Sequence, residues 1–160
     1  MRIAGKAIAA ALTAAVRAAS SSSLRAQALD KKVLSFAAAR KMAAAAQEAA
    51  RARRVDVVIV VVDDGGHIIL LERMDGAQVA SVNVGIGKAR TAAIYRRPSK
   101  VFEDQIRNGR VAALALADAT PLQGGVPVLL DGKVIGAIGV SGDSPQIDED
   151  IAIEGARAFK

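Results

Sequence analysis

The sequence predicts an α+β fold in which a single antiparallel β-sheet is covered by α-helices on both faces. Two pairs of apolar runs, within residues 55–76 and 124–142, are each joined by a short turn that contains glycine. Such pairs are typical of β-hairpins. Segments that favour helix lie before, between and after the two hairpins, and this order is typical of one sheet packed between helices. The length of 160 residues fits one domain with a single hydrophobic core.

The first hairpin is expected to form the centre of the fold. Val57–Val62 is an unbroken β-branched run, Ile68–Leu71 is a second apolar run, and Asp63-Asp64-Gly65-Gly66 supplies the turn. Because neither run alternates with polar residues, we expect both faces of this hairpin to be buried. Its second strand leads into Arg73-Met74-Asp75-Gly76, where two opposite charges directly follow core sequence. We expect a ligand site at this junction.

Two long segments before the second hairpin favour helix. Phe36–Arg53 is rich in alanine and contains no glycine or proline, and Ser35 is positioned to cap its first turn. Ala77–Tyr95 is the second expected helix, although Gly85 and Gly87 each cost about 1 kcal/mol relative to alanine. Glycines within a helix indicate tight packing or a close backbone neighbour.

Shorter elements complete the expected order. Ser99 is positioned to cap a short helix over Lys100–Arg107. Val111–Ala117 is ambiguous, and we expect irregular or strand-like structure there. Asp131-Gly132 is the turn of the second hairpin, and Pro145 opens the last helix, where its missing N–H costs nothing.

The composition excludes several classes of site. Cysteine is absent, which rules out disulfides, thiolate metal sites and thiol catalysis. Aromatic residues make up only 2% of the chain, too few to suggest a surface that stacks nucleic-acid bases. The net charge of +6 comes largely from residues 1–28, and the remainder holds 18 basic and 16 acidic residues. We therefore expect no nucleic-acid partner.

Residues 1–28 have the order of parts of a secretory signal peptide. Met1–Lys6 is basic, Ala7–Val16 is apolar, and Ala26-Gln27-Ala28 offers small residues for cleavage. The alternative is an Ala/Ser-rich leader that is not removed. Cleavage predicts a periplasmic or secreted protein, and retention predicts a cytoplasmic one. The apolar run is too short for a stable transmembrane span.

One residue of the first hairpin and two residues of the helix expected after it are candidates for a binding site. His67, the only histidine, is either a solvated turn residue or a ligand to a metal cofactor such as haem iron. Lys88 and Thr91 share one helix face. Lys88 is positioned to pair with Asp75 or with an anionic ligand, and Thr91 offers a weak oxygen ligand or a hydrogen bond.

The acidic residues around the first hairpin allow a second interpretation. Asp63, Asp64 and Asp75 lie close in sequence and could hold a hard cation. Turn formation, together with an ion pair to Arg73 at the strand end, is the explanation we prefer.

Six short motifs resemble the haem-binding GlcG/HbpS family, which is itself similar to the C-terminal domain of PduO-type proteins. In chain order, from residue 61 to residue 142, they are Val-Val-Asp-Asp-Gly-Gly-His, Glu-Arg-Met-Asp-Gly-Ala, Lys-Ala-Arg-Thr-Ala, Arg-Pro-Ser, Gly-Gly-Val-Pro-Val and Gly-Ala-Ile-Gly-Val-Ser-Gly. The resemblance places a GlcG/HbpS-like domain at residues 33–160.

The resemblance implies a profilin-like α-β-α domain that assembles into hexamers or octamers and takes part in haem sequestration or degradation. It also implies His67 or Thr91 as the iron ligand. The cofactor-binding set it suggests is His67, Arg73, Asp75, Lys88, Thr91 and Ser99. Cations available for the haem propionates are Arg73, Lys88, Arg96 and Arg97. The alternative function is a non-catalytic oligomeric module that holds a small organic acid or a partner protein. The absence of a convincing acid–base pair argues against an enzyme, whereas the family resemblance allows haem degradation. We therefore make no prediction of enzymatic activity.

Overall fold

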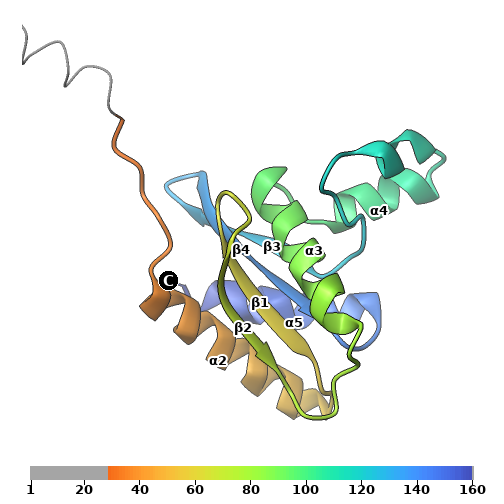
Figure 1. Ribbon diagram of the computed structural model, residues 1–160. Helices are drawn as coiled ribbons and strands as arrows, with labels where there is room; N and C mark the ends of the chain where they lie inside the picture. Colours follow the sequence, from red (N-terminus) through yellow and green to blue (C-terminus); the bar gives the residue numbers. More distant parts are fainter. Residues whose placement is uncertain (1–28, 160) are drawn as a thin grey trace, which may run out of the picture. The chain divides into compact units, whose positions relative to one another are not determined.

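The computed structural model describes residues 29–159 (Figure 1). In chain order its elements are α2 (Phe36–Arg53), β1 (Val58–Asp63), β2 (Ile68–Arg73), α3 (Ser81–Ile94), α4 (Lys100–Arg107), a 3₁₀-helix (Val111–Ala115), β3 (Gly125–Leu130), β4 (Lys133–Ser141) and α5 (Pro145–Arg157). The expected leader and signal peptide at residues 1–28 lie outside the described residues. Within the described part, no helix combines the length and apolar character needed to cross a membrane.

The two hairpins form one sheet, as the sequence predicts. The strand order is β2-β1-β4-β3, and every neighbouring pair is antiparallel. At one end of the sheet, Val58 of β1 lies between Arg73 of β2 and Ser141 of β4. The turns of both hairpins lie at the opposite end, since Asp63 pairs with Gly136 near the start of β4.

Helices cover both faces of this sheet, which confirms the α+β prediction. In Figure 1, α2 and α5 lie behind the sheet and α3 crosses its front. Ile59 and Val61 of β1 belong to the apolar core shared with α2 and α5. The alternate residues Val58, Val60 and Val62 belong to the core shared with α3. Both faces of β1 are therefore buried because each is packed against helices.

The expectation that both strands of the first hairpin are buried on both faces holds only for β1. β2 is the outer strand of the sheet and is only partly buried along its length. Its first residue, Ile68, is 50% exposed. A run of apolar residues occurs in outer strands as well as in inner ones. The sequence pattern alone therefore did not show that β2 is an outer strand and β1 an inner one.

The second expected helix is shorter than the sequence indicated. α3 begins at Ser81 rather than Ala77, because turns occupy the preceding segment, with Ala77 N–H donating to Met74 O at 3.0 Å. The close approach expected at its glycines is present at Gly85. A Cβ atom built on Gly139 of β4 would lie 2.5 Å from Gly85 O, so glycine lets α3 pack directly against the sheet.

The remaining expectations for local structure have mixed outcomes. Ser35 caps α2, since its Oγ accepts from Ala38 N–H at 3.2 Å. Pro145 opens α5 as expected. Val111–Ala115 forms a 3₁₀-helix instead of strand-like or irregular structure. Ser99 precedes α4, but its side chain makes no capping hydrogen bond, because its hydroxyl is engaged elsewhere.

Candidate functional site

Thr91 and Ser99, two of the predicted site residues, hold one segment, residues 119–125, against α3. Thr91 Oγ1 donates to Gly87 O at 2.7 Å and accepts from Thr120 N–H at 2.7 Å. Ser99 Oγ donates to Leu122 O at 2.5 Å and accepts from Gly125 N–H at 2.8 Å. Both side chains are fully buried.

These hydrogen bonds bear on two expectations. Because Ser99 Oγ already hydrogen-bonds to Leu122 O and Gly125 N–H, it does not cap α4. Because Thr91 Oγ1 is buried and already both donates and accepts, it offers no open position to an iron atom in this conformation. A cofactor could reach either side chain only if residues 119–125 moved away.

Lys88 forms a buried ion pair next to the same segment. Its Nζ lies 2.7 Å from Asp148 Oδ2 and donates to Val140 O at 3.1 Å. The side chains of Lys88 and Asp148 are only 4% and 3% exposed. Lys88 is therefore paired with Asp148, not with Asp75 as expected, and its ammonium is closed to an anionic ligand.

Gly124 covers this ion pair. It has φ +122°, and a Cβ atom there would lie 3.0 Å from Lys88 Nζ and 2.8 Å from Val140 O. Burial raises the pKa of the Asp148 carboxyl above its ordinary value, while the Lys88 ammonium and the Asp143 N–H oppose this rise. The Gly124-Gly125 motif thus packs against a buried ion pair and does not form an open carboxylate pocket.

A second buried polar cluster lies beside this ion pair and was missed in the sequence. Gln123 N–H donates to Glu103 Oε2 at 2.6 Å, and Gln123 Nε2 donates to Glu149 Oε2 at 2.6 Å. Asp148 and Glu149 follow the start of α5, where acids usually interact with the helix dipole. Nothing local in the sequence indicates that both also have partners more than 20 residues away.

His67 is a predicted site residue whose side chain is open to a ligand. Its side chain is 81% exposed, and its Nδ1 lies 3.3 Å from Asp63 Oδ2. Asp63 Oδ1 also accepts from the N–H groups of Gly65 and His67, at 2.9 and 2.8 Å. Although partial burial acts to raise it, these hydrogen bonds hold the pKa of Asp63 below its ordinary value.

Arg90 lies beside this turn and was not among the predicted residues. Gly66, with φ +82°, packs against α3, so that a Cβ atom there would lie 2.7 Å from Arg90 Cγ and 3.2 Å from Ile94 Cγ2. Arg90 is partly exposed and forms a long ion pair of 3.6 Å with Asp118. The aliphatic stem of Arg90 and the side chain of Ile94 therefore lie against Gly66, the residue before His67, although more than 20 residues separate them from it in sequence.

Arg73 and Asp75 are both exposed. Arg73 is the last residue of β2, at the end of the strand opposite to the His67 turn. Since β2 begins directly after His67, the strand separates His67 and Arg73 by roughly 20 Å. Among the described residues, Arg73 has no side-chain hydrogen bond or ion pair, so the expected strand-end ion pair is absent. The six predicted residues therefore do not form one site within a single chain.

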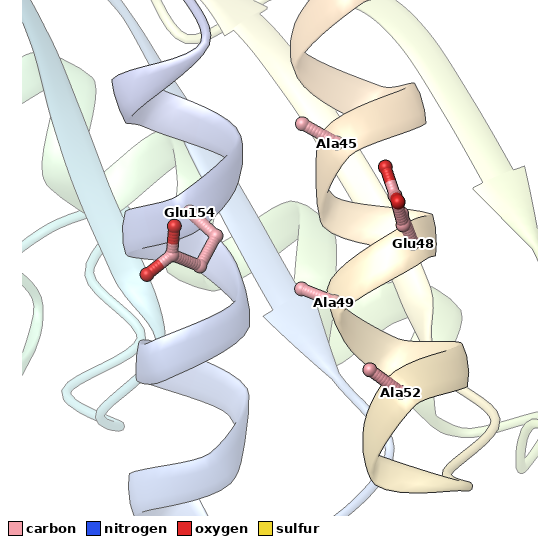
Figure 2. Close-up of a pocket in the computed structure, with 5 residues that line it drawn as sticks. All are labelled: Ala45, Glu48, Ala49, Ala52 and Glu154. Atoms are coloured by element: carbon pink, nitrogen blue, oxygen red, sulfur yellow. The ribbon is translucent and has the colours of Figure 1, made fainter.

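A shallow groove of about 260 Å³ lies on the other side of the sheet, between α2 and α5 (Figure 2). Ala45, Ala49 and Ala52 line it from α2, with Glu48 and Glu154 as its charged residues. The groove contains none of the predicted site residues. Its two carboxylates disfavour an anionic ligand.

The family described as "Haem degrading protein HbpS-like" matches residues 34–157, nearly the whole of the sheet and its helices. The chain belongs to the HbpS-like family. This HbpS-like chain is 45% identical to Protein GlcG of Escherichia coli strain K12 over 75 residues, which cover 47% of this chain and 56% of GlcG. The match thus spans little more than half the length of that relative.

Two solved structures support the same assignment of this HbpS-like chain. The Klebsiella pneumoniae protein ORFY superposes with a TM-score of 0.78 at 32% identity, covering 83% of this chain and 94% of ORFY. The PduOC:Heme complex superposes with a TM-score of 0.73 at 29% identity, covering 79% and 95% of the two chains. The resemblance read from the six motifs is therefore confirmed at the level of family and fold.

Proposed function

We propose that this HbpS-like chain binds haem as a homo-oligomer and that His67 is the axial ligand of the iron. The observation that carries the proposal is the exposed imidazole whose Nδ1 faces the Asp63 carboxylate at 3.3 Å. A carboxylate at Nδ1 fixes the ring orientation and leaves Nε2 free, which is the usual arrangement of a histidine that ligates a metal. The relative solved as a PduOC:Heme complex supports this cofactor class.

The surroundings of His67 fit haem better than a bare metal ion. No group of three or more histidine, aspartate or glutamate side chains with metal-binding geometry occurs among residues 29–159. Haem brings its own ring ligands and requires only axial protein ligands. Ile68 is 50% exposed and Ile94 packs beside Gly66, so both offer apolar surface near the turn. Arg90 would supply a cation for a propionate by exchanging its long ion pair with Asp118.

The other predicted ligands and cations are assigned differently. Thr91 and Ser99 are proposed to hold residues 119–125, and Lys88 to neutralise Asp148. Arg97 contacts the Phe102 ring, with its guanidinium carbon 5.8 Å from the ring centroid, and donates from Nε to Tyr95 O at 3.2 Å. Bound haem supplies an iron centre whose reactivity depends on its axial ligand, and Asp63 and His67 would hold and orient it.

The alternative function, binding of a small organic acid between the hairpin ends, has less support. The ammonium that would bind the carboxylate is Lys88, and it is buried and paired with Asp148. We therefore favour haem over a small organic acid as the ligand.

A haemin titration of protein without a histidine tag tests the proposal, since His67 is then the only imidazole present. We expect a Soret shift at micromolar protein that His67→Ala abolishes and Thr91→Val retains. A wild-type protein that leaves the haemin spectrum unchanged would refute haem binding. A shift retained by His67→Ala and lost in Thr91→Val would reassign the ligand.

Assembly and export complete the proposal. We expect six or eight subunits in sedimentation equilibrium, and removal of residues 1–28 during export. The mass of the protein isolated from its natural host tests the second expectation, because retention of these residues contradicts it.

A further inference from the structure

The two outer strands of the sheet differ in their protection against further pairing. β3 contains Pro127, which has no N–H to donate, and it packs against both α3 and α5. β2 reads Ile-Ile-Leu-Leu-Glu-Arg and contains no proline, glycine or lysine, its charges are confined to its last two residues, and its one register shift lies near its start. Outer strands without such residues pair readily with another strand. The β2 edge is therefore the one open to a partner.

The register shows which main-chain groups of β2 point outward. Met74 N–H donates to Val57 O at 3.1 Å, so Met74 faces β1. In an antiparallel pair, successive residues alternate between facing the partner strand and facing away. The N–H and C=O groups of Leu71 and Arg73 therefore point away from β1. The side chain of Leu71 belongs to the core on the α3 face but is only partly buried.

We propose that β2 pairs antiparallel with β2 of a second copy of this chain, about a two-fold axis that sets Leu71 opposite Leu71 of the partner subunit. In this register the N–H of Leu71 in each chain donates to the C=O of Leu71 of the partner subunit, so the two hydrogen bonds are related by the two-fold axis. It brings Arg73 level with Ile69 of the partner subunit, where β2 has its register shift and regular pairing would end. Arg73 then lies two residues from His67 of the partner subunit.

A second copy is favoured over a foreign strand because it completes the proposed haem site, on which this part of the inference rests. Within one chain, β2 keeps His67 and Arg73 roughly 20 Å apart. Across the two-fold axis, the exposed Arg73 of one chain, which has no ion-pair partner among the described residues, approaches the exposed His67 turn of the other. One chain would supply the iron ligand and the other a cation for a propionate.

Single cysteines test the interface without reference to haem, because the chain has none of its own. Leu71→Cys and Leu129→Cys place a thiol on β2 and on the exposed part of β3, respectively. Directly opposed Cβ atoms in a sheet lie about 5 Å apart. With a short bis-maleimide at micromolar protein, we expect a covalent dimer from Leu71→Cys and not from Leu129→Cys. Equal yields, or a dimer from Leu129→Cys alone, would overturn the interface.

Complementation tests the shared site. His67→Ala and Arg73→Ala should each weaken haemin binding, the latter about tenfold. When the two variants are co-expressed, each mixed dimer regains one site with both His67 and Arg73, so wild-type affinity should return for a fraction of the sites. If the single variants are defective and co-expression restores nothing, the shared site is wrong although haem binding stands. If wild-type protein ignores haemin while Leu71→Cys still cross-links, the proposed function fails and the interface stands.

Discussion

Lys88 Nζ lies 2.7 Å from Asp148 Oδ2, and this buried ion pair joins α3 to α5 beside the C-terminal end of β4. The two helices lie on opposite faces of the sheet. The pair therefore ties both helical layers together and supports the segment that leads into β3.

Removing one partner of this ion pair should be costly. Lys88→Met leaves the Asp148 carboxylate buried without its counter-charge, and we expect a loss of about 3–5 kcal/mol in the free energy of unfolding. Urea denaturation measures this loss. The double variant Lys88→Met/Asp148→Leu should recover much of it, because an apolar pair replaces the charges. A double variant as unstable as Lys88→Met would contradict this account.

Thr91→Val should lower the free energy of unfolding, because it removes a buried hydroxyl that is hydrogen-bonded to residue 120. The variant keeps the shape of the side chain but leaves Thr120 N–H without its acceptor, which should cost about 1–3 kcal/mol. Hydrogen exchange should show lower protection of the Thr120 amide. Thr91→Ser retains the hydroxyl and serves as the control, so similar exchange rates in the two variants would argue against this role.

Gly124→Ala should destabilise the protein more than Gly109→Ala. Both glycines have positive φ, of +122° and +92°, but a Cβ atom on Gly109 meets nothing within 4 Å. Backbone strain of order 1–3 kcal/mol applies to both variants, while only Gly124→Ala also collides with Val140 O. Thermal unfolding of the two variants side by side measures the difference, and equal melting temperatures would show that the collision is relieved.

The turn at Asp63 should make a pH-dependent contribution to stability. The folded-state pKa of Asp63 lies below its ordinary value of 3.8, so the unfolded chain binds the proton more tightly. The stabilisation is therefore present above about pH 4 and is lost as the pH falls through the lowered folded pKa. Asp63→Asn keeps an acceptor oxygen but cannot ionise, so the stability of this variant should lose the pH dependence that the wild type shows in this window. An unchanged pH dependence would exclude Asp63 as the source.

The histidine turn shows how far sequence reasoning reached at the candidate site. His67 and the Asp63 turn were predictable because the turn residues are adjacent in sequence and their hydrogen bonds are local. Arg90 was not predictable, because only the packing of α3 against Gly66 brings it to the turn. Asp148 was not predictable as the partner of Lys88 for the same reason. The sequence suggested Asp75 or an anionic ligand, whereas Asp148 lies 60 residues away along the chain.

By itself, the sequence determined the two hairpins, their turns, the helical segments and the family, because apolar runs, turn glycines and capping residues act over a few neighbouring positions. Only the tertiary structure decided that β2 is an outer strand, that Ser99 and Thr91 bind residues 119–125, and that His67 and Arg73 lie at opposite ends of β2. These outcomes depend on strand order and on which helix covers which face. Both arise from packing between distant segments, for which an apolar run or a lone polar residue specifies no particular partner.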